Sequence, residues 1–259
     1  MKKVVIGRHS LYSVAQQTFY GSDGLWLPEF DLFGLATSSH SAYNDYPIAE
    51  RDVQLAFELI RQAAKEQLSG FALLQHLLKA VYFGFSQVDL AAHLTGIIAA
   101  YEPDHFLGRI DHPHSKPRVQ LIVLQQQAQR LSLACIGNFM VYKVSANETK
   151  LLFGTAKWAG GDGWAVIYTS FLLEPKVRYQ AVMPTIYAWE TELEPGDMIV
   201  VCTPYTPITE INLAQLLDEH HGDLEAINHH FTTSVKASFT SPVFAAEYGV
   251  AWAMTRWEE

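Results

Sequence analysis

The order of hydrophobic patterns along the chain is the feature that most constrains its fold. Apolar residues recur at helical spacing in two neighbouring segments, 47–68 and 71–100. Short strand patterns come before these segments, and strand patterns dominate again from 119 to 202. The one-for-one alternation of strands and helices that builds a parallel sheet is absent. The order therefore predicts an α+β fold in which antiparallel strands and helices form separate layers.

The strand patterns pair into hairpins. Segments 119–124 and 131–136 flank a glutamine-rich turn, and segments 139–144 and 150–153 flank a second turn. The tetrapeptide at 194–197, Glu-Pro-Gly-Asp, has proline and glycine where a type II turn requires them. The remaining predicted elements are strands at 4–6, 31–36, 165–172, 179–182, 198–202 and 248–256 and helices at 211–220 and 224–237.

The composition fits one globular domain over residues 1–259. Hydrophobic residues make up 49% of the chain and charged residues 17%, which is too apolar for a disordered protein. The net charge of −9 and the scattered lysines and arginines argue against nucleic acid and against an anionic membrane as partners. The sequence has no signal-peptide core and no apolar run of about 18 residues, so we expect a cytoplasmic protein.

Two cysteines, Cys135 and Cys202, lie inside apolar runs of the sequence. A free cysteine in such a run behaves as a small buried hydrophobic residue, which is the interpretation we favour for both. A disulfide or a reactive thiol is the alternative.

Four segments of the chain carry recognisable motifs. Segment 192–203 contains a Gly-Asp turn and an apolar strand that ends in Cys-Thr, and segment 130–142 contains a strand that leads into Gly-Asn-Phe-Met-Val-Tyr. Segment 31–37 is an apolar strand, and segment 248–256 is a closing strand that ends in arginine. Together these segments resemble the PPM family, the type 2C protein phosphatases, over nearly the whole chain.

The resemblance implies a specific version of the α+β class. PPM phosphatases are four-layer α-β-β-α sandwiches, in which two antiparallel sheets are flanked by helices. In the family, aspartates at strand ends hold two Mg²⁺ or Mn²⁺ ions, which generate the attacking water and neutralise the phosphate. This chemistry depends on carboxylates because hard dications need charged oxygen ligands.

At the positions that match the family's metal-binding aspartates, this chain carries neutral residues. They stand at the Asp-Gly-Met-Gly-Gly turn, at the Gly-Asp pair, at the later Asp-Gly and at the final Asp-Asn. The residues of this chain at those positions are Thr37, Ser38, Asn138, Pro204, Tyr248 and Gly249. Without carboxylates, two adjacent dications would repel each other uncompensated, so the two-metal site is not expected to form.

The sequence therefore predicts a pseudophosphatase. Such a protein keeps the sandwich, needs no metal cofactor and acts as a binding or regulatory module for a protein or phosphoprotein partner. One alternative is an active metal-dependent serine/threonine phosphatase that holds Mg²⁺ or Mn²⁺ through relocated carboxylates, with Asp45, Asp104, Asp111 and Asp162 as candidates. A second alternative is an unrelated hydrolase on a similar sandwich, in which Ser38 or Ser41 acts with His40.

Two groups of histidines invite a metal interpretation. Segment 104–114 could offer a transition-metal set, although a polar loop with solvated side chains is the interpretation we favour. The members of that set are Asp104, His105, Asp111, His112 and His114. The pairs at 220–221 and 229–230 fall on predicted helices, where adjacent residues do not face one another. We therefore expect these four histidines to be solvent-facing or partly packed.

Overall fold

The structure is a computed structural model of the chain. It describes residues 4–10, 21–38, 48–64, 67–87, 118–137, 139–146, 148–154, 167–168, 186–203, 206, 208, 211–238 and 249–257. The strands are β1 (Val4–Ser10), β2 (Gly21–Leu27), β3 (Leu32–Ser38), β4 (Arg118–Gln127), β5 (Arg130–Ile136), β6 (Met140–Ser145), β7 (Glu148–Gly154), β8 (Ile167–Tyr168), β9 (Tyr187–Glu192), β10 (Met198–Cys202) and β11 (Gly249–Arg256). The helices are α1 (Ile48–Ala63), α2 (Gly70–Gln87), α5 (Leu213–Glu219) and α6 (Leu224–Ser238), with a 3-10 turn, η1, at Pro28–Phe30.

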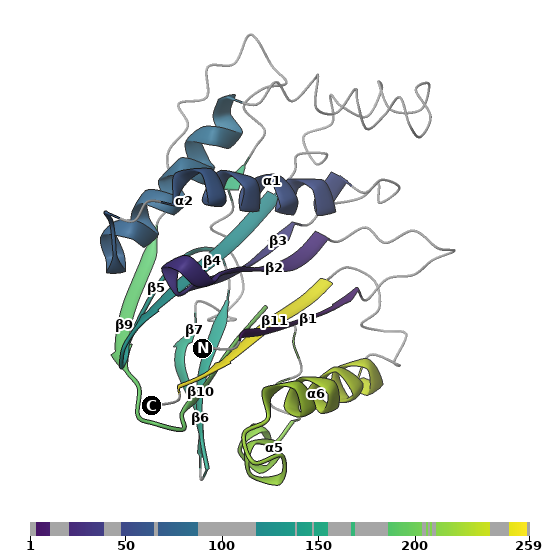
Figure 1. The fold of residues 1–259 in the computed structure, drawn as a ribbon. Coiled ribbons are helices and arrows are strands. Elements are labelled where there is room, and N and C mark those ends of the chain that lie inside the picture. The colour runs from purple at the N-terminus through teal and green to yellow at the C-terminus, as the bar shows by residue number, and fades with distance from the viewer. Residues whose placement is uncertain are drawn as a thin grey trace, which may run out of the picture.

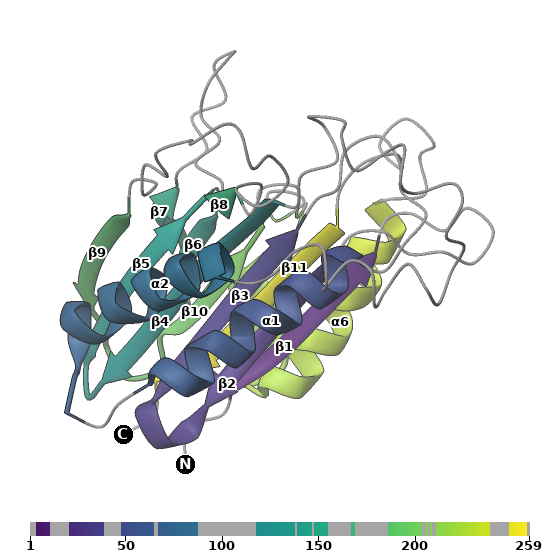
Figure 2. The ribbon, with the colours of Figure 1, turned by 90° about the horizontal axis from the view of Figure 1, so that it is seen from above.

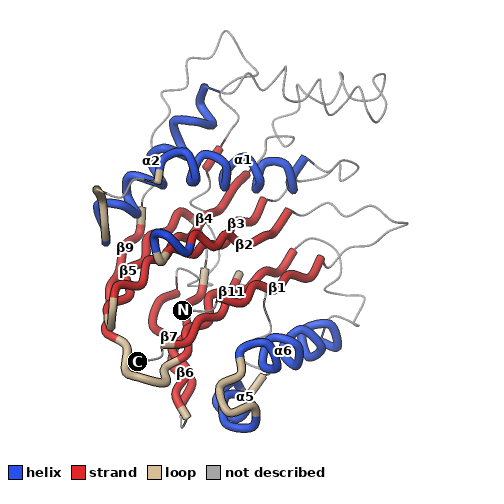
Figure 3. Tube along the Cα trace, viewed as in Figure 1, coloured by secondary structure: helices blue, strands red, loops and turns tan. Residues whose placement is uncertain are grey.

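The strands form two antiparallel sheets (Figures 1 and 3). The order in sheet 1 is β1-β11-β10-β6-β7, and the order in sheet 2 is β2-β3-β4-β5-β9, with β8 paired to the start of β4. Helices α1 and α2 cover the outer face of sheet 2, and α5 and α6 lie over sheet 1 (Figure 1). The predicted four-layer α-β-β-α sandwich is confirmed.

Alternation along the strands builds the core between the two sheets. On β3, Phe33 and Leu35 point into this inner cluster, whereas Leu32 and Ala36 point to the helices. The strands of sheet 1 alternate in the same way. The inner cluster consists of Phe33, Leu35, Ile122, Leu124, Leu131, Leu133, Cys135, Phe139, Val141, Leu193, Ile199, Val201, Ala251 and Ala253, all buried.

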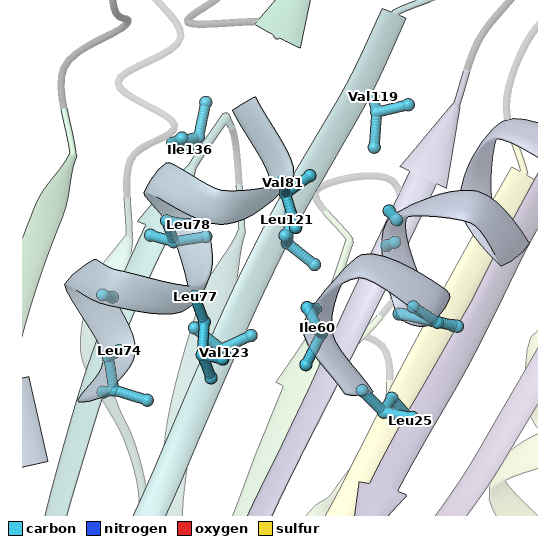
Figure 4. Packing of buried hydrophobic residues seen from close by; sticks show 14 of the residues in the cluster. Leu25, Ile60, Leu74, Leu77, Leu78, Val81, Val119, Leu121, Val123 and Ile136 are labelled. Atoms are coloured by element: carbon cyan, nitrogen blue, oxygen red, sulfur yellow. The ribbon is translucent and has the colours of Figure 1, made fainter. Parts of the chain in front are cut away.

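The helices bury the apolar stripes that the sequence predicted. Figure 4 shows Ile60 of α1 and Leu77 and Val81 of α2 against the outer face of sheet 2, where Leu121 and Val123 lie beneath them. Helical spacing puts these side chains on one face of each helix. Helix α1 lies within the predicted segment 47–68, and α2 covers the first part of the predicted segment 71–100. Among the described helices, none combines the length and the apolar character needed to cross a bilayer.

The predicted hairpin between 119–124 and 131–136 is present, but the predicted bounds of its glutamine-rich turn are wrong. Residues 125–127 continue β4, and the turn itself lies at 128–129. The Gln125 side chain accepts a hydrogen bond from the backbone N–H of Gly70 (2.6 Å) and donates one to the backbone carbonyl of Phe30 (2.9 Å). These tertiary partners satisfy the amide, so a polar residue can occupy a buried strand position.

The predicted turn at 194–197 is present, and its aspartate supports the fold. Gly196 has a φ of 92°, as position three of a type II turn requires. The Asp197 carboxylate accepts a hydrogen bond from the backbone N–H of Glu194 (2.7 Å) and pairs with Nζ of Lys143 at 2.6 Å. Asp197 is only 4% exposed. The Gly-Asp of this motif therefore fixes the start of β10 against β6.

Replacing Asp197 with asparagine is expected to lower the free energy of unfolding by about 2 kcal/mol, because a buried charge-assisted pair is lost. Urea denaturation followed by circular dichroism measures the change. The matched control is Glu190→Gln, which removes the charge from the exposed pair between Arg130 and Glu190 (3.4 Å). That change is expected to cost less than about 1 kcal/mol. Equal effects of the two substitutions would contradict a structural role for Asp197.

Candidate functional site

Several strand ends meet at one end of the sandwich (Figure 2). Ile6 of β1 packs directly against Gly24 of β2, so these two residues lie opposite each other across the two sheets. Ile6 is paired with Ala253 of β11, and Gly24 is paired with Leu35 of β3. Beyond Ile6 and Leu35, β1 and β3 continue to their C-terminal ends. Strand β11 is antiparallel to β1, so the N-terminal end of β11 lies in the same direction. These ends of the two sheets therefore lie at the same end of the molecule.

In sheet 2, the inward-facing rows of β3 and β4 change from apolar to polar at this end. On β3 the row of Phe33 and Leu35 continues with Thr37. On β4 the row that contains Ile122 reaches Gln120, which is the pairing partner of Thr37. Gln120 is 6% exposed, so its amide lies inside the sandwich. The end of sheet 2 is thus lined by neutral polar groups.

A glycine turn closes the same end between β5 and β6. Gly137 has a φ of 104°, a conformation that side chains disfavour. A Cβ at this position would lie 2.6 Å from the Cβ of Gln120. The turn that leads out of β5 is therefore packed directly on Gln120, and the next residue, Asn138, lies outside the described residues.

Buried hydroxyls occupy the end of β10. Oγ1 of Thr203 lies 3.2 Å from Oγ1 of Thr206 and accepts a hydrogen bond from the backbone N–H of Ala251 (3.3 Å). Both threonines are buried. Burial raises the pKa of the neighbouring Cys202 thiol to about 12, against a partial opposing effect of its hydrogen bond with Thr206. The Cys202 side chain belongs to the cluster under α5 and α6, so this end of sheet 1 offers hydroxyls, which are weak ligands for a hard dication.

Both cysteines are free and buried, as predicted. Burial also raises the pKa of the Cys135 thiol to about 12. Since the thiolate is the reactive form, neither cysteine is suited to act as a nucleophile at neutral pH.

The aspartates on the described strands of the core are bound elsewhere. The Asp23 carboxylate of β2 faces α1, where it accepts hydrogen bonds from Nε2 of Gln54 (2.9 Å) and from the backbone N–H of Gly24 (2.9 Å). Asp197 stands at the beginning of β10, the opposite end from Thr203. Within the described part of the chain, no group of three or more histidine, cysteine, aspartate or glutamate side chains could hold a metal ion.

The sequence matches no protein-family model and no curated protein. Solved structures match it over its whole length. The catalytic domain of the phosphatase PstP in complex with two manganese ions gives a TM-score of 0.61 at 14% identity, covering 100% of this chain and 99% of that one. Mycobacterium tuberculosis PstP/Ppp gives a TM-score of 0.60 at 15% identity, covering 100% of this chain and 99% of that one. The S. agalactiae serine/threonine phosphatase gives a TM-score of 0.59 at 10% identity, covering 100% of both chains.

The chain has the PPM phosphatase fold. At this level of identity the likeness establishes the architecture and leaves the chemistry to the residues of the site. The end of the sandwich where the strand ends meet is where the resemblance places the PPM metal positions, because Thr37 and Ser38 end β3 and Gly249 begins β11. The described side chains that face inward at that end, Thr37, Gln120 and Thr203, are neutral, and a neutral donor set does not suit hard dications.

Several predicted site residues lie outside the described residues. Of the positions matched to PPM aspartates, these are Asn138, Pro204 and Tyr248. The transition-metal set proposed for segment 104–114 and the relocated carboxylates of the alternative also lie there. The residues concerned are Asp45, Asp104, His105, Asp111, His112, His114 and Asp162, together with His40 and Ser41 of the hydrolase alternative. These predictions stay predictions.

Sequence reasoning missed Gln120, Thr203 and Thr206. A signal for Gln120 was present, because it stands two residues before Ile122 in an otherwise apolar inward row. Thr203 follows the inward residue Val201 in the same way. Its contact with Thr206 joins two residues outside the strand pattern, so the sequence does not predict it.

Proposed function

We propose that this chain is a pseudophosphatase, a PPM-fold binding or regulatory module without a two-metal centre. One observation carries the proposal. The inward rows of β3, β4 and β10 end in the neutral residues Thr37, Gln120 and Thr203 at the end of the sandwich to which the resemblance assigns the PPM carboxylates. Every residue matched to a metal-binding aspartate is also neutral.

The magnitude of charge repulsion supports this conclusion. Two dications about 4 Å apart repel by about 4 kcal/mol in water and about 16 kcal/mol at an effective dielectric constant of about 20. Carboxylates offset this repulsion, but threonine hydroxyls and a glutamine amide carry no net charge. A site with only these donors would not hold the two ions that activate water for phosphoester hydrolysis.

The partner we propose is a protein or phosphoprotein. One solved structure of similar fold, PppA of Pseudomonas aeruginosa (TM-score 0.57, 14% identity), is described as a key regulatory component of a type VI secretion system. Regulation is thus a known use of the fold.

Turnover of p-nitrophenyl phosphate tests the proposal. Purified protein with millimolar Mn²⁺ or Mg²⁺ is expected to release p-nitrophenol no faster than a buffer blank with the same metal. The PstP catalytic domain serves as the positive control. Because Asp45, Asp104, Asp111 and Asp162 belong to segments that adjoin strand ends at this end of the sandwich, relocated ligands are the alternative to test.

The outcomes separate the three hypotheses. Metal-dependent turnover that is lost with chelator and with aspartate-to-asparagine changes at those four positions would establish an active metal-dependent phosphatase. Turnover that survives chelator and is lost in Ser38→Ala or Ser41→Ala would establish the hydrolase alternative. Either result would overturn the pseudophosphatase proposal.

A further inference from the structure

Two histidines of the outer helical layer of sheet 1 are in contact. His220 directly follows α5, and His230 lies in α6. Nε2 of His220 lies 3.4 Å from Nδ1 of His230, and the ring planes are inclined by 71°. His220 is half-buried and His230 is exposed, so solutes can reach both nitrogens. The contact joins one residue from each of the two histidine pairs, 220–221 and 229–230. The sequence did not predict that the two pairs are in contact.

The separation of the two nitrogens suits a shared metal ion. Histidine nitrogens bind zinc at about 2.0–2.1 Å. Two such ligands on one tetrahedral ion are therefore about 3.3 Å apart. The observed 3.4 Å, which the two rings span with a hydrogen bond, is close to this spacing.

The backbone holds both histidines in place. The N–H of His220 donates to the carbonyl of Leu216 (3.1 Å), and its own carbonyl accepts from the N–H of Asp223 (2.9 Å). Gly222, at a φ of 76°, closes the turn to α6. On the other side, Phe231 next to His230 is fully buried and anchors α6 on sheet 1. A ligand would bind to positions that are already ordered, which lowers the entropic cost of binding.

We propose that His220 and His230 form a two-histidine site for a first-row transition-metal dication, of the class Cu²⁺, Ni²⁺ or Zn²⁺. Imidazole suits these ions, and affinity is expected to follow the order in which Cu²⁺ exceeds Ni²⁺ and Zn²⁺. Within the described residues no third side chain completes the set. The site is separate from the strand ends and independent of the proposed function.

A bound ion would link α5 to α6 in the folded state only. Folding and binding are then coupled, and the midpoint of thermal unfolding rises with metal concentration. With Ni²⁺ at roughly a hundred times its dissociation constant, a rise of about 5 °C is expected for a chain of this size.

Ni²⁺ titration of four alanine variants tests the site. His220→Ala and His230→Ala are each expected to lower Ni²⁺ affinity by about tenfold or more in calorimetry and to abolish the thermal shift. His221→Ala and His229→Ala are the matched controls, because they remove neighbouring exposed histidines that are not in this contact. Both controls are expected to behave like the wild type.

Because the chain has other histidines, the test uses only the difference in Ni²⁺ affinity between the two pairs of variants. Circular dichroism checks that each variant is folded, and His230→Gln replaces His230→Ala if alanine disturbs α6. Wild-type Ni²⁺ affinity in His220→Ala and His230→Ala would overturn the proposal. An equal loss in the His221 and His229 controls would overturn it as well.

Discussion

Replacing Gly137 with alanine is expected to lower the free energy of unfolding by about 4 kcal/mol. Two costs add. The φ of 104° strains any residue with a Cβ by about 1–3 kcal/mol. The new methyl group would also overlap the Gln120 side chain, whose Cβ, Cγ and Oε1 lie 2.6, 2.7 and 2.8 Å away, and such overpacking costs about 1–3 kcal/mol. Chemical denaturation followed by circular dichroism measures the sum.

A second glycine isolates the packing part of this effect. Gly196 has a similar φ of 92°, but a Cβ there would meet nothing within 4 Å. Gly196→Ala should therefore show the backbone strain alone, about 2 kcal/mol. The double variant Gly137→Ala, Gln120→Ala should recover part of the loss. Equal costs for the two glycine substitutions would contradict the close packing of the β5–β6 turn on Gln120.

Replacing Trp252 with alanine is also expected to cost about 4 kcal/mol, because a fully buried tryptophan leaves a large cavity. Trp252 of β11 packs edge-to-face on Phe231 of α6, with ring centroids 5.1 Å apart. Its indole N–H donates to Oδ1 of Asn228 at 2.8 Å. Alanine would remove both contacts between α6 and sheet 1. Urea denaturation and the thermal midpoint measure the loss.

The variant Trp252→Phe separates the ring contact from the hydrogen bond. It keeps an aromatic ring beside Phe231 but leaves the Asn228 amide without its indole donor, so a cost of about 1–2 kcal/mol is expected. If alanine were no worse than phenylalanine, Trp252 would not be the anchor of α6 described above.

Segments with a complete apolar pattern could be predicted closely from the sequence. The strand predicted at 198–202 has the observed bounds of β10, because all five of its residues are buried between α5, α6 and sheet 2. Strands at 131–136 and 139–144 and the helix at 224–237 were also found within a residue or two. In each case burial on a continuous face produces the pattern that the sequence displays.

Elements that depend on tertiary partners were missed. Strand β2 begins with Gly21-Ser-Asp-Gly24, which is typical of a turn, and it is held in place by pairing with β3. Strand β9 is an edge strand with mostly exposed residues, so little of its pattern is apolar. The glutamines at 125–127 were assigned to a turn because they are polar, and the side-chain partners of Gln125, which are Gly70 and Phe30, are distant in the sequence.

The candidate site likewise has residues that could be predicted from the sequence and contacts that could not. The neutral residues Thr37 and Asn138, which the resemblance matches to PPM aspartates, are visible in the sequence, since the match is made residue by residue. The network of Thr203 and Thr206 and the contact of His220 with His230 needed the structure. Both depend on turns that bring together residues of separate elements.

The motifs that survive in this chain are those that serve the fold. Asp197 holds the turn before β10 through Lys143, and Gly137 allows the turn after β5. Neither role needs a metal. Both residues therefore support the sandwich independently of the residues at its strand ends, such as Thr37.

Isothermal titration calorimetry with Mn²⁺ tests the central claim most directly. We expect no saturable binding of two ions at millimolar Mn²⁺, because the described inward-facing side chains at these strand ends are hydroxyls and an amide, and the nearby carboxylate of Asp23 faces α1. Saturable binding of two Mn²⁺ ions per chain, lost when Asp45, Asp104, Asp111 and Asp162 are changed to asparagine, would contradict the account and establish a rebuilt metal centre.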